Sequence, residues 1–308
     1  MIETRKSLGL IGLSFATFAL AAGSLYRATE SLRFSSYTIY SSPEEKDKRE
    51  KDLAEKSERF KRLVKSIDAD LDSGVDVNSD VQPQYGWYPI NNILQAFGVS
   101  ANEQVPGARE ALARLANKFL ARGQEVTPKV FEDAVRYAVP LNIVKKMLER
   151  NPKLLNAPLR EGGTPYFLAV YELNYMDYNG LRKEQEAIAK FLLEKGADAN
   201  PNFVSEDYGQ VNLLKYMLLR GYLPSVEFLL KNGVKVEKSD LDFAKKVQKD
   251  CIDRYGVNPD PRRYPDAPMR CFKPQMDKRE TAMKLLERSL NGEDVGHTLK
   301  AKETETHK

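Results

Sequence analysis

The sequence predicts an all-α fold of about five irregular helix–turn–helix repeats, with capping helices at both ends. Two patterns support this prediction: apolar helix ends followed by a glycine and a polar turn, and helix starts led by proline. The composition agrees, because 42% hydrophobic and 30% charged residues suit amphipathic helices around a core. Stacked repeats bury a shared apolar layer and usually serve as binding surfaces.

Residues 1–23 are expected to form a signal peptide, with an uncleaved signal anchor as the alternative. Arg5 and Lys6 precede an uncharged run over 8–26, and small residues at its end offer cleavage sites. The run is close to the ~18–20 residues that cross a bilayer. Both versions predict export, to the periplasm or to an inner-membrane anchor facing it. Residues 24–42 are expected to be a linker.

A capping helix is expected over 43–72. Ser42 is a good N-cap, Pro43 suits the first helical position and Glu45 completes a capping box. The early part of this helix is nearly all charged. An apolar stripe then follows at helical spacing: Leu53, Phe60, Leu63, Val64, Ile67 and Leu71.

The clearest repeated helix end is the segment 191–200, Phe-Leu-Leu-Glu-Lys-Gly-Ala-Asp-Ala-Asn. Gly196 is expected to end the helix in the left-handed conformation, which a residue without Cβ adopts at low cost. Asp198 and Asn200 suit the tight turn that follows, because their side chains can hydrogen-bond to nearby backbone. Related turns are expected at Gly74, Gly123, Gly233 and, in degenerate form, at Asn151-Pro152.

Over 73–250 the chain resembles ankyrin repeats. The family's turn motif is best matched at 192–200, and its helix-opening box is present as Gly-Gly-Thr-Pro-Tyr-Phe-Leu-Ala over 162–169 and more faintly over 86–93. In the box, Thr164 can cap the helix and a proline follows at its first position. Further proline-led starts lie at Thr127-Pro128 and Leu223-Pro224. The resemblance implies a solenoid that binds other proteins.

The C-terminal region, 251–290, is expected to contain a proline-rich disulfide loop and a terminal helix. Cys251 and Cys271 bracket a stretch with few apolar residues, and a bond between them would stabilise the fold by about 3 kcal/mol. Two free thiols are the alternative. A disulfide suits an oxidising compartment and so supports export. The charged tail, 291–308, is expected to be disordered.

The sequence offers little for catalysis, and neither an enzyme nor a cofactor or metal site is expected. The two histidines, His297 and His307, both lie in the tail, which removes the usual general base from the folded body. Carboxylate pairs such as Glu132 and Asp133 are expected on exposed helix faces. A net charge of +4, from 48 basic and 44 acidic residues, argues against nucleic acid as the main partner.

Aromatic side chains are the candidates for binding a partner protein, because interfaces favour rigid rings with a polar tip. Tyr171 and Tyr175 are four residues apart and Tyr178 follows by three, so all three are expected to share one helical face. Packing of these side chains against the next repeat is the alternative interpretation. The full set of candidates is Tyr171, Tyr175, Met176, Tyr178, Tyr85, Trp87, Tyr88, Phe203 and Tyr208.

These features together predict a non-catalytic protein–protein interaction module in the bacterial periplasm. The most specific hypothesis is an immunity protein that neutralises a secreted toxin, such as a phospholipase effector. Two alternatives stay open: a periplasmic scaffold or stress-protection factor, and a structural ankyrin protein held at the membrane by residues 8–26.

Overall fold

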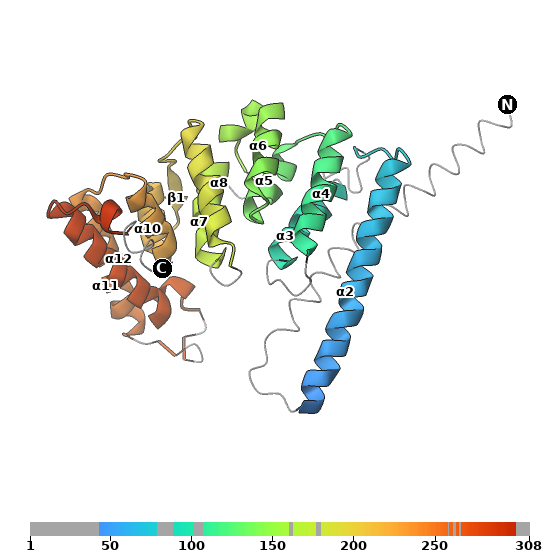
Figure 1. Ribbon diagram of the computed structural model, residues 1–308. Coiled ribbons are helices and arrows are strands. Elements are labelled where there is room, and N and C mark those ends of the chain that lie inside the picture. Colours follow the sequence, from blue (N-terminus) through green and yellow to red (C-terminus); the bar gives the residue numbers. More distant parts are fainter. Residues whose placement is uncertain are drawn as a thin grey trace. The chain divides into compact units, whose positions relative to one another are not determined.

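The computed structural model describes residues 43–78, 89–100, 107–159, 163–176, 180–257, 259–260, 263–264 and 266–299. These residues are mostly helical, as the predicted all-α class requires (Figure 1). They divide into an N-terminal unit, residues 1–165 with 178–188, and a C-terminal unit, residues 166–177 with 189–308. The predicted signal segment 1–23 and linker 24–42 lie outside the described residues.

The N-terminal unit is built from helical hairpins. It contains α2 (Pro43–Asp72), α3 (Pro89–Ser100), α4 (Ala108–Ala121), α5 (Pro128–Arg136), α6 (Leu141–Arg150), the 3-10 helix η3 (Pro152–Asn156) and residues 182–188 of α8. In addition to the contacts within the hairpins α3/α4 and α5/α6, α3 contacts α5 and α4 contacts α6. The first helices of successive hairpins therefore pack together, and so do the second helices. α2 contacts α4 and covers this side of the stack.

The C-terminal unit repeats this contact pattern. It contains α7 (Pro165–Met176) after its first residue, the end of α8 (Arg182–Glu194), α9 (Leu213–Arg220), α10 (Leu223–Lys231), α11 (Lys238–Tyr255), the 3-10 helix η5 (Met269–Cys271) and α12 (Lys273–Leu290). Here α9 contacts α10 and α11, and α12 contacts α10 and α11. A short antiparallel hairpin of β1 (Phe203–Ser205) and β2 (Gly209–Val211) precedes α9, and the sequence analysis did not predict it.

The predicted glycine turns adopt the expected conformation. Gly196 has φ +90°, and Gly74, Gly123 and Gly233 also have positive φ. The Gly196 amide donates to Leu193 O at 3.0 Å and the Ala197 amide donates to Leu192 O at 3.0 Å, which satisfies two carbonyls at the end of the helix. The degenerate turn differs, because Asn151 has φ −138° and leads into η3.

The polar residues after these glycines also form the turns expected of them. Asp198 Oδ1 accepts from the Asn200 amide at 3.0 Å, and Asp76 Oδ1 accepts from the Asn78 amide at 2.9 Å. Asn78 then links its own turn to the next one, because its Nδ2 donates to Gly123 O at 3.0 Å. In the N-terminal unit, hydrogen bonds between turns thus add to the contacts between helices.

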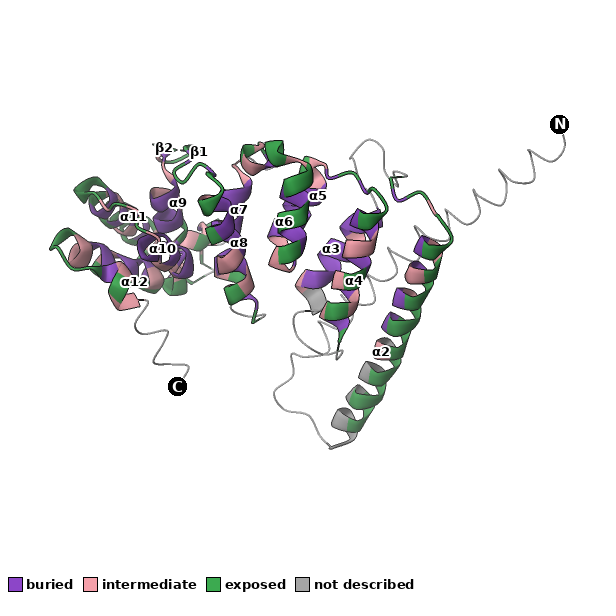
Figure 2. Ribbon diagram, turned by 45° about the horizontal axis from the view of Figure 1, so that its top comes forward, coloured by how far each residue is buried: buried purple, intermediate pink, exposed green. Residues whose placement is uncertain are grey.

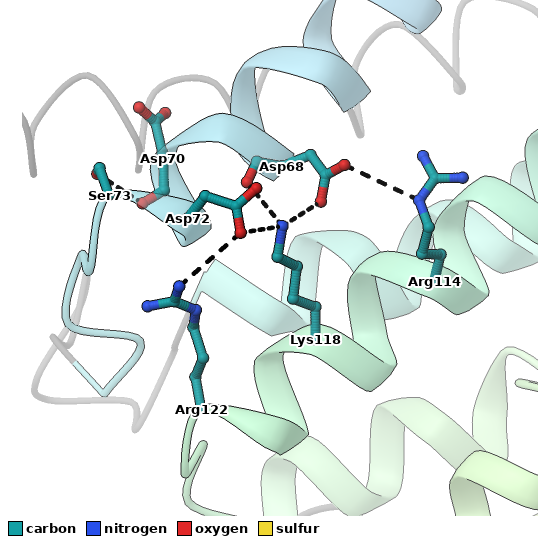
Figure 3. A network of polar contacts seen from close by, with 7 residues as sticks. All are labelled: Asp68, Asp70, Asp72, Ser73, Arg114, Lys118 and Arg122. Atoms are coloured by element: carbon teal, nitrogen blue, oxygen red, sulfur yellow. Dashed lines mark hydrogen bonds and ion pairs between the residues drawn. The ribbon is translucent and has the colours of Figure 1, made fainter.

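Helix α2 attaches through its C-terminal half. Figure 2 shows buried positions gathered there, including Phe60, Ile67 and Leu71 of the predicted apolar stripe. Polar contacts reinforce this apolar contact (Figure 3): Lys118 Nζ of α4 lies 2.6 Å from Asp68 Oδ1 and 2.7 Å from Asp72 Oδ1. The hydrogen bonds raise the pKa of Lys118 and lower the pKa of Asp72.

A fully buried arginine of α12 closes the C-terminal unit. Arg279 donates to Leu218 O and Leu219 O, each at 2.8 Å, at the end of α9. It also donates to Arg270 O at 3.0 Å and to Gln248 Oε1 at 2.8 Å. Burial lowers the pKa of its guanidinium to about 10. One side chain thus ties four segments together and donates to carbonyls at the end of α9, of which Leu218 O also accepts from the Gly221 amide at 3.2 Å.

The tail is more ordered than expected at its beginning. Residues 295–299 form a helical turn, and Val295 is buried. Asp294 starts this turn, since its Oδ1 accepts from the His297 amide at 2.8 Å. An apolar anchor and a capping carboxylate explain the order. Residues 300–308 lie outside the described residues.

Gly196→Val is expected to lower the free energy of unfolding by about 2 kcal/mol, because a β-branched residue tolerates the left-handed conformation poorly. A Cβ at this position would meet no atom within 4 Å, so the cost is conformational and not steric. Urea unfolding measures it. Lys195→Val, at the exposed turn residue immediately before it, is the control, and equal stability of the two variants would contradict the proposed turn.

Arg279→Met is expected to lower the free energy of unfolding by about 3 kcal/mol or more, since it removes the side-chain donor to Leu219 O, Arg270 O and Gln248 Oε1. Lys284→Met, at an exposed position of the same helix, should change it by less than about 0.5 kcal/mol. Urea unfolding of both variants compares them. A small effect at Arg279 would show that water or relaxation replaces the network.

Candidate functional site

The predicted aromatic candidates fall into two groups. Tyr85, Trp87, Tyr88 and Tyr178 lie outside the described residues. Tyr171, Tyr175, Met176, Phe203 and Tyr208 are described, and all belong to the C-terminal unit.

Three rings share one face of α7, as a spacing of four residues requires. The ring centroids of Phe167 and Tyr171 lie 5.8 Å apart, and those of Tyr171 and Tyr175 lie 5.6 Å apart. The expectation that Tyr171 and Tyr175 share a face is therefore confirmed. Met176, the next residue, is only 5% exposed, because it faces the interior of the unit. This placement removes Met176 from the candidate surface.

Rings from later elements extend this row. Phe203 of β1 lies 4.3 Å from Phe167, and Tyr216 of α9 lies 5.4 Å from Phe167, both measured between centroids. Tyr222, between α9 and α10, lies 5.3 Å from Tyr171 in an edge-to-face contact. We call these six residues the aromatic surface: Phe167, Tyr171, Tyr175, Phe203, Tyr216 and Tyr222.

The three tyrosine hydroxyls at one end of the aromatic surface lie close together. Tyr175 Oη is 2.5 Å from Tyr222 Oη and 3.3 Å from Tyr171 Oη. Burial raises the pKa of both Tyr171 and Tyr222, and hydrogen bonding within the trio adds to the increase for Tyr222. The phenols of Tyr171 and Tyr222 therefore stay protonated across the physiological pH range and can donate or accept hydrogen bonds.

The aromatic surface is part core and part exterior. Tyr222 and Phe167 are buried, Tyr171, Phe203 and Tyr216 are half-buried, and Tyr175 is 41% exposed. The tyrosines therefore pack against the following hairpin, as the alternative interpretation expects, and still present area to solvent. Tyr175 is the side chain best placed to contact a partner.

Arg220, the last residue of α9, borders the aromatic surface. Its Cζ lies 5.3 Å from the centroid of the Tyr216 ring, within cation–π range. Its Nη2 also donates to Tyr216 Oη at 3.1 Å. The sequence analysis missed Arg220, Tyr216 and Tyr222. The run Tyr216 to Tyr222 does contain two tyrosines and an arginine, but only folding brings it to α7.

Tyr208, the remaining candidate, is tied to α11. Its hydroxyl donates to Asp250 Oδ2 at 3.0 Å, and its ring lies 5.4 Å from that of Phe243. Burial, and then the bond to Asp250, raise the pKa of Tyr208 to about 12. The preceding residue, Asp207, pairs with Arg270. The turn between β1 and β2 is therefore held from two sides.

The cysteines are paired as expected. Cys251 and Cys271 lie at disulfide-bonding distance, with their Cα atoms 5.1 Å apart. Both are buried in a small cluster with Met276 and the half-buried Tyr255. Asp250 and Arg270, which hold the β1–β2 turn, are the residues immediately before the two cysteines. The disulfide therefore fixes the positions of Asp250 and Arg270, which hold the β1–β2 hairpin. This hairpin carries Phe203.

The expectation of an exposed carboxylate pair is wrong for Glu132 and Asp133. Glu132 is 4% exposed and Asp133 is fully buried. α5 packs against both α3 and α6, so this face of the helix is interior. Asp133 accepts from Asn91 Nδ2 and Lys129 Nζ, each at 2.7 Å, while Glu132 accepts from Arg136 at 3.0 Å. Burial raises the pKa of Asp133, and these contacts oppose the increase.

The described residues contain neither a metal-ligand cluster nor a membrane-spanning helix. In that part of the chain, no group of three or more His, Cys, Asp or Glu side chains is arranged to hold a metal ion. None of the described helices is long and apolar enough to span a bilayer.

Comparison with known proteins gave no match, whether with family models, curated proteins or solved structures. The function of the aromatic surface must therefore be argued from its geometry.

Replacing both cysteines with serine is expected to lower the free energy of unfolding by about 3 kcal/mol, because the bond closes a loop of 20 residues. Urea unfolding of the oxidised wild type, the reduced wild type and the double variant measures this. The reduced wild type and the double variant should have the same free energy of unfolding. Alkylation of both thiols without prior reduction would contradict the pairing.

Proposed function

We propose that this chain is an exported, non-catalytic ankyrin-type repeat protein that binds another protein through the aromatic surface. The observation that carries the proposal is the exposed part of this surface, where rings from α7, β1 and α9 meet. Rigid aromatic side chains dominate the binding energy of protein interfaces because they bury a large area with little loss of entropy.

The repeat assignment rests on two features of the described residues. Both units contain hairpins whose first helices pack on first helices and whose second helices pack on second helices. The left-handed glycines at 74, 123, 196 and 233 end helices that belong to such hairpins or cap them. Asp76 and Asp198 form the same turn after two of these glycines.

Export is supported by the paired cysteines and by the apolar run over 8–26, which lies outside the described residues. Disulfides persist mainly in oxidising compartments such as the bacterial periplasm. The most specific role we propose is that of an immunity protein that holds and neutralises a secreted toxin, such as a phospholipase effector. A stable folded domain that exposes aromatic side chains to a partner suits that role.

Affinity capture from envelope extract with the tagged full chain, followed by mass spectrometry, tests this proposal. The expected result is one stoichiometric partner that is toxic when expressed alone in the periplasm and harmless when this chain is present. Capture of a non-toxic envelope protein would overturn the immunity role. Failure to capture any stoichiometric partner would overturn the binding function.

Tyr171→Ala combined with Tyr175→Ala is expected to weaken binding of the captured partner at least tenfold. Each aromatic anchor contributes ~2 kcal/mol or more, and ~1.4 kcal/mol corresponds to one decade of affinity. Isothermal titration measures the change, with circular dichroism as the check on folding.

The matched control is Tyr255→Ala combined with Tyr264→Ala, which removes two half-buried tyrosines elsewhere in the same unit. If both pairs lower affinity equally, the interface does not lie on the aromatic surface.

A further inference from the structure

The head group of Arg220 is held in place before any ligand arrives. It stacks over the Tyr216 ring at 5.3 Å and donates one hydrogen bond, at 3.1 Å, to the hydroxyl of the same side chain. Arg220 is exposed. Because two contacts fix its planar fork, binding through its remaining N–H groups loses less side-chain entropy than binding through a free arginine.

Two other cations of the C-terminal unit, Arg270 and Lys215, have carboxylate partners, and Arg220 has none among the residues that the structure describes. Arg270 pairs with Asp207, and Lys215 Nζ lies 3.6 Å from Asp240 Oδ1. The partner of Arg220 is instead a neutral phenol. Its guanidinium therefore keeps full charge and several donors for an anionic group.

The surroundings of Arg220 favour a carboxylate attached to an apolar body. Tyr171 and Tyr222 lie close enough to interact electrostatically with the guanidinium. Their hydroxyls can turn a proton toward an oxygen held there. The exposed parts of Tyr171, Tyr175 and Phe203 offer ring faces and edges to an apolar neighbour of that carboxylate.

We propose that the aromatic surface recognises an acidic segment of its partner polypeptide, in which an Asp or Glu side chain stands next to an aromatic residue. The carboxylate is held by Arg220, because the planar guanidinium can donate two parallel hydrogen bonds to the two carboxylate oxygens. The aromatic residue packs on Tyr171 and Tyr175. This inference rests on the proposed binding function and adds the chemistry of the partner.

Blocked dipeptides test the recognition without the natural partner. N-acetyl-Phe-Glu-amide, N-acetyl-Phe-Gln-amide and N-acetyl-Phe-Lys-amide are titrated into the full chain at low ionic strength, and binding is followed by NMR chemical shifts. The Glu peptide should bind about fivefold more tightly than its neutral Gln isostere, as one exposed charge pair allows. The Lys peptide should bind most weakly. The Glu preference should shrink in high salt.

Two variants identify the residue responsible. Arg220→Gln should abolish the preference for the Glu peptide and leave binding of the Gln peptide unchanged. Arg254→Gln, which removes an exposed arginine from α11, changes the net charge equally and should keep the preference. Circular dichroism and melting temperature confirm that both variants are folded.

Three results would overturn the inference: equal affinity of the Glu and Gln peptides, equal loss of preference in the two variants, or no binding of any peptide at 10 mM, roughly the weak limit for such small ligands. These results can be distinguished from a failure of the proposed binding function. If the captured partner loses affinity with the tyrosine variants but not with Arg220→Gln, the aromatic surface binds proteins and only the acidic chemistry is wrong.

Discussion

One hairpin can stack closely on the next only if the helix before the turn ends abruptly, and an abrupt end leaves backbone carbonyls without donors. In the described part of this chain, the glycines at 74, 123, 196 and 233, which follow α2, α4, α8 and α10, meet both requirements. A left-handed residue redirects the chain, and its own amide and the next one donate back to the helix. Ala138, with φ 48°, ends α5 in a similar way without the conformational freedom of glycine. The repeated contacts between first helices, and between second helices, follow from these turns.

The C-terminal unit adds contacts that the turns alone do not provide. Arg279 joins α12 to the end of α9, and α9 carries Tyr216 of the aromatic surface and the adjacent Arg220. The disulfide positions Asp250 and Arg270, which hold the β1–β2 turn and with it Phe203. Arg279 and the disulfide therefore both hold elements that carry residues of the aromatic surface. Stability and binding geometry depend on the same few long-range contacts.

Local spacing explains what could be predicted. The glycine turns, the shared face of Tyr171 and Tyr175 and the cysteine pair all depend on residues close in sequence or on a short loop. The contacts of Tyr222 with α7, of Phe203 with Phe167 and of Arg279 with α9 depend on tertiary packing, which no local pattern encodes. The buried Glu132 and Asp133 show the same limit. Charged residues on a helix predict exposure. Here the cations Lys129 and Arg136, one turn away, compensate the charges of the buried carboxylates.

The half-buried state of the tyrosines links folding to recognition. A free tyrosine loses rotamer freedom when it binds, whereas Tyr171 and Tyr175 are already held by ring contacts and by the hydroxyl of Tyr222. The entropy of ordering them is lost during folding and not during association. In the proposed interface, the buried ring of Tyr222 supports the exposed ring of Tyr175, which contacts the partner. A surface of this kind can bind tightly over a modest area, because its anchors are ordered before the partner arrives.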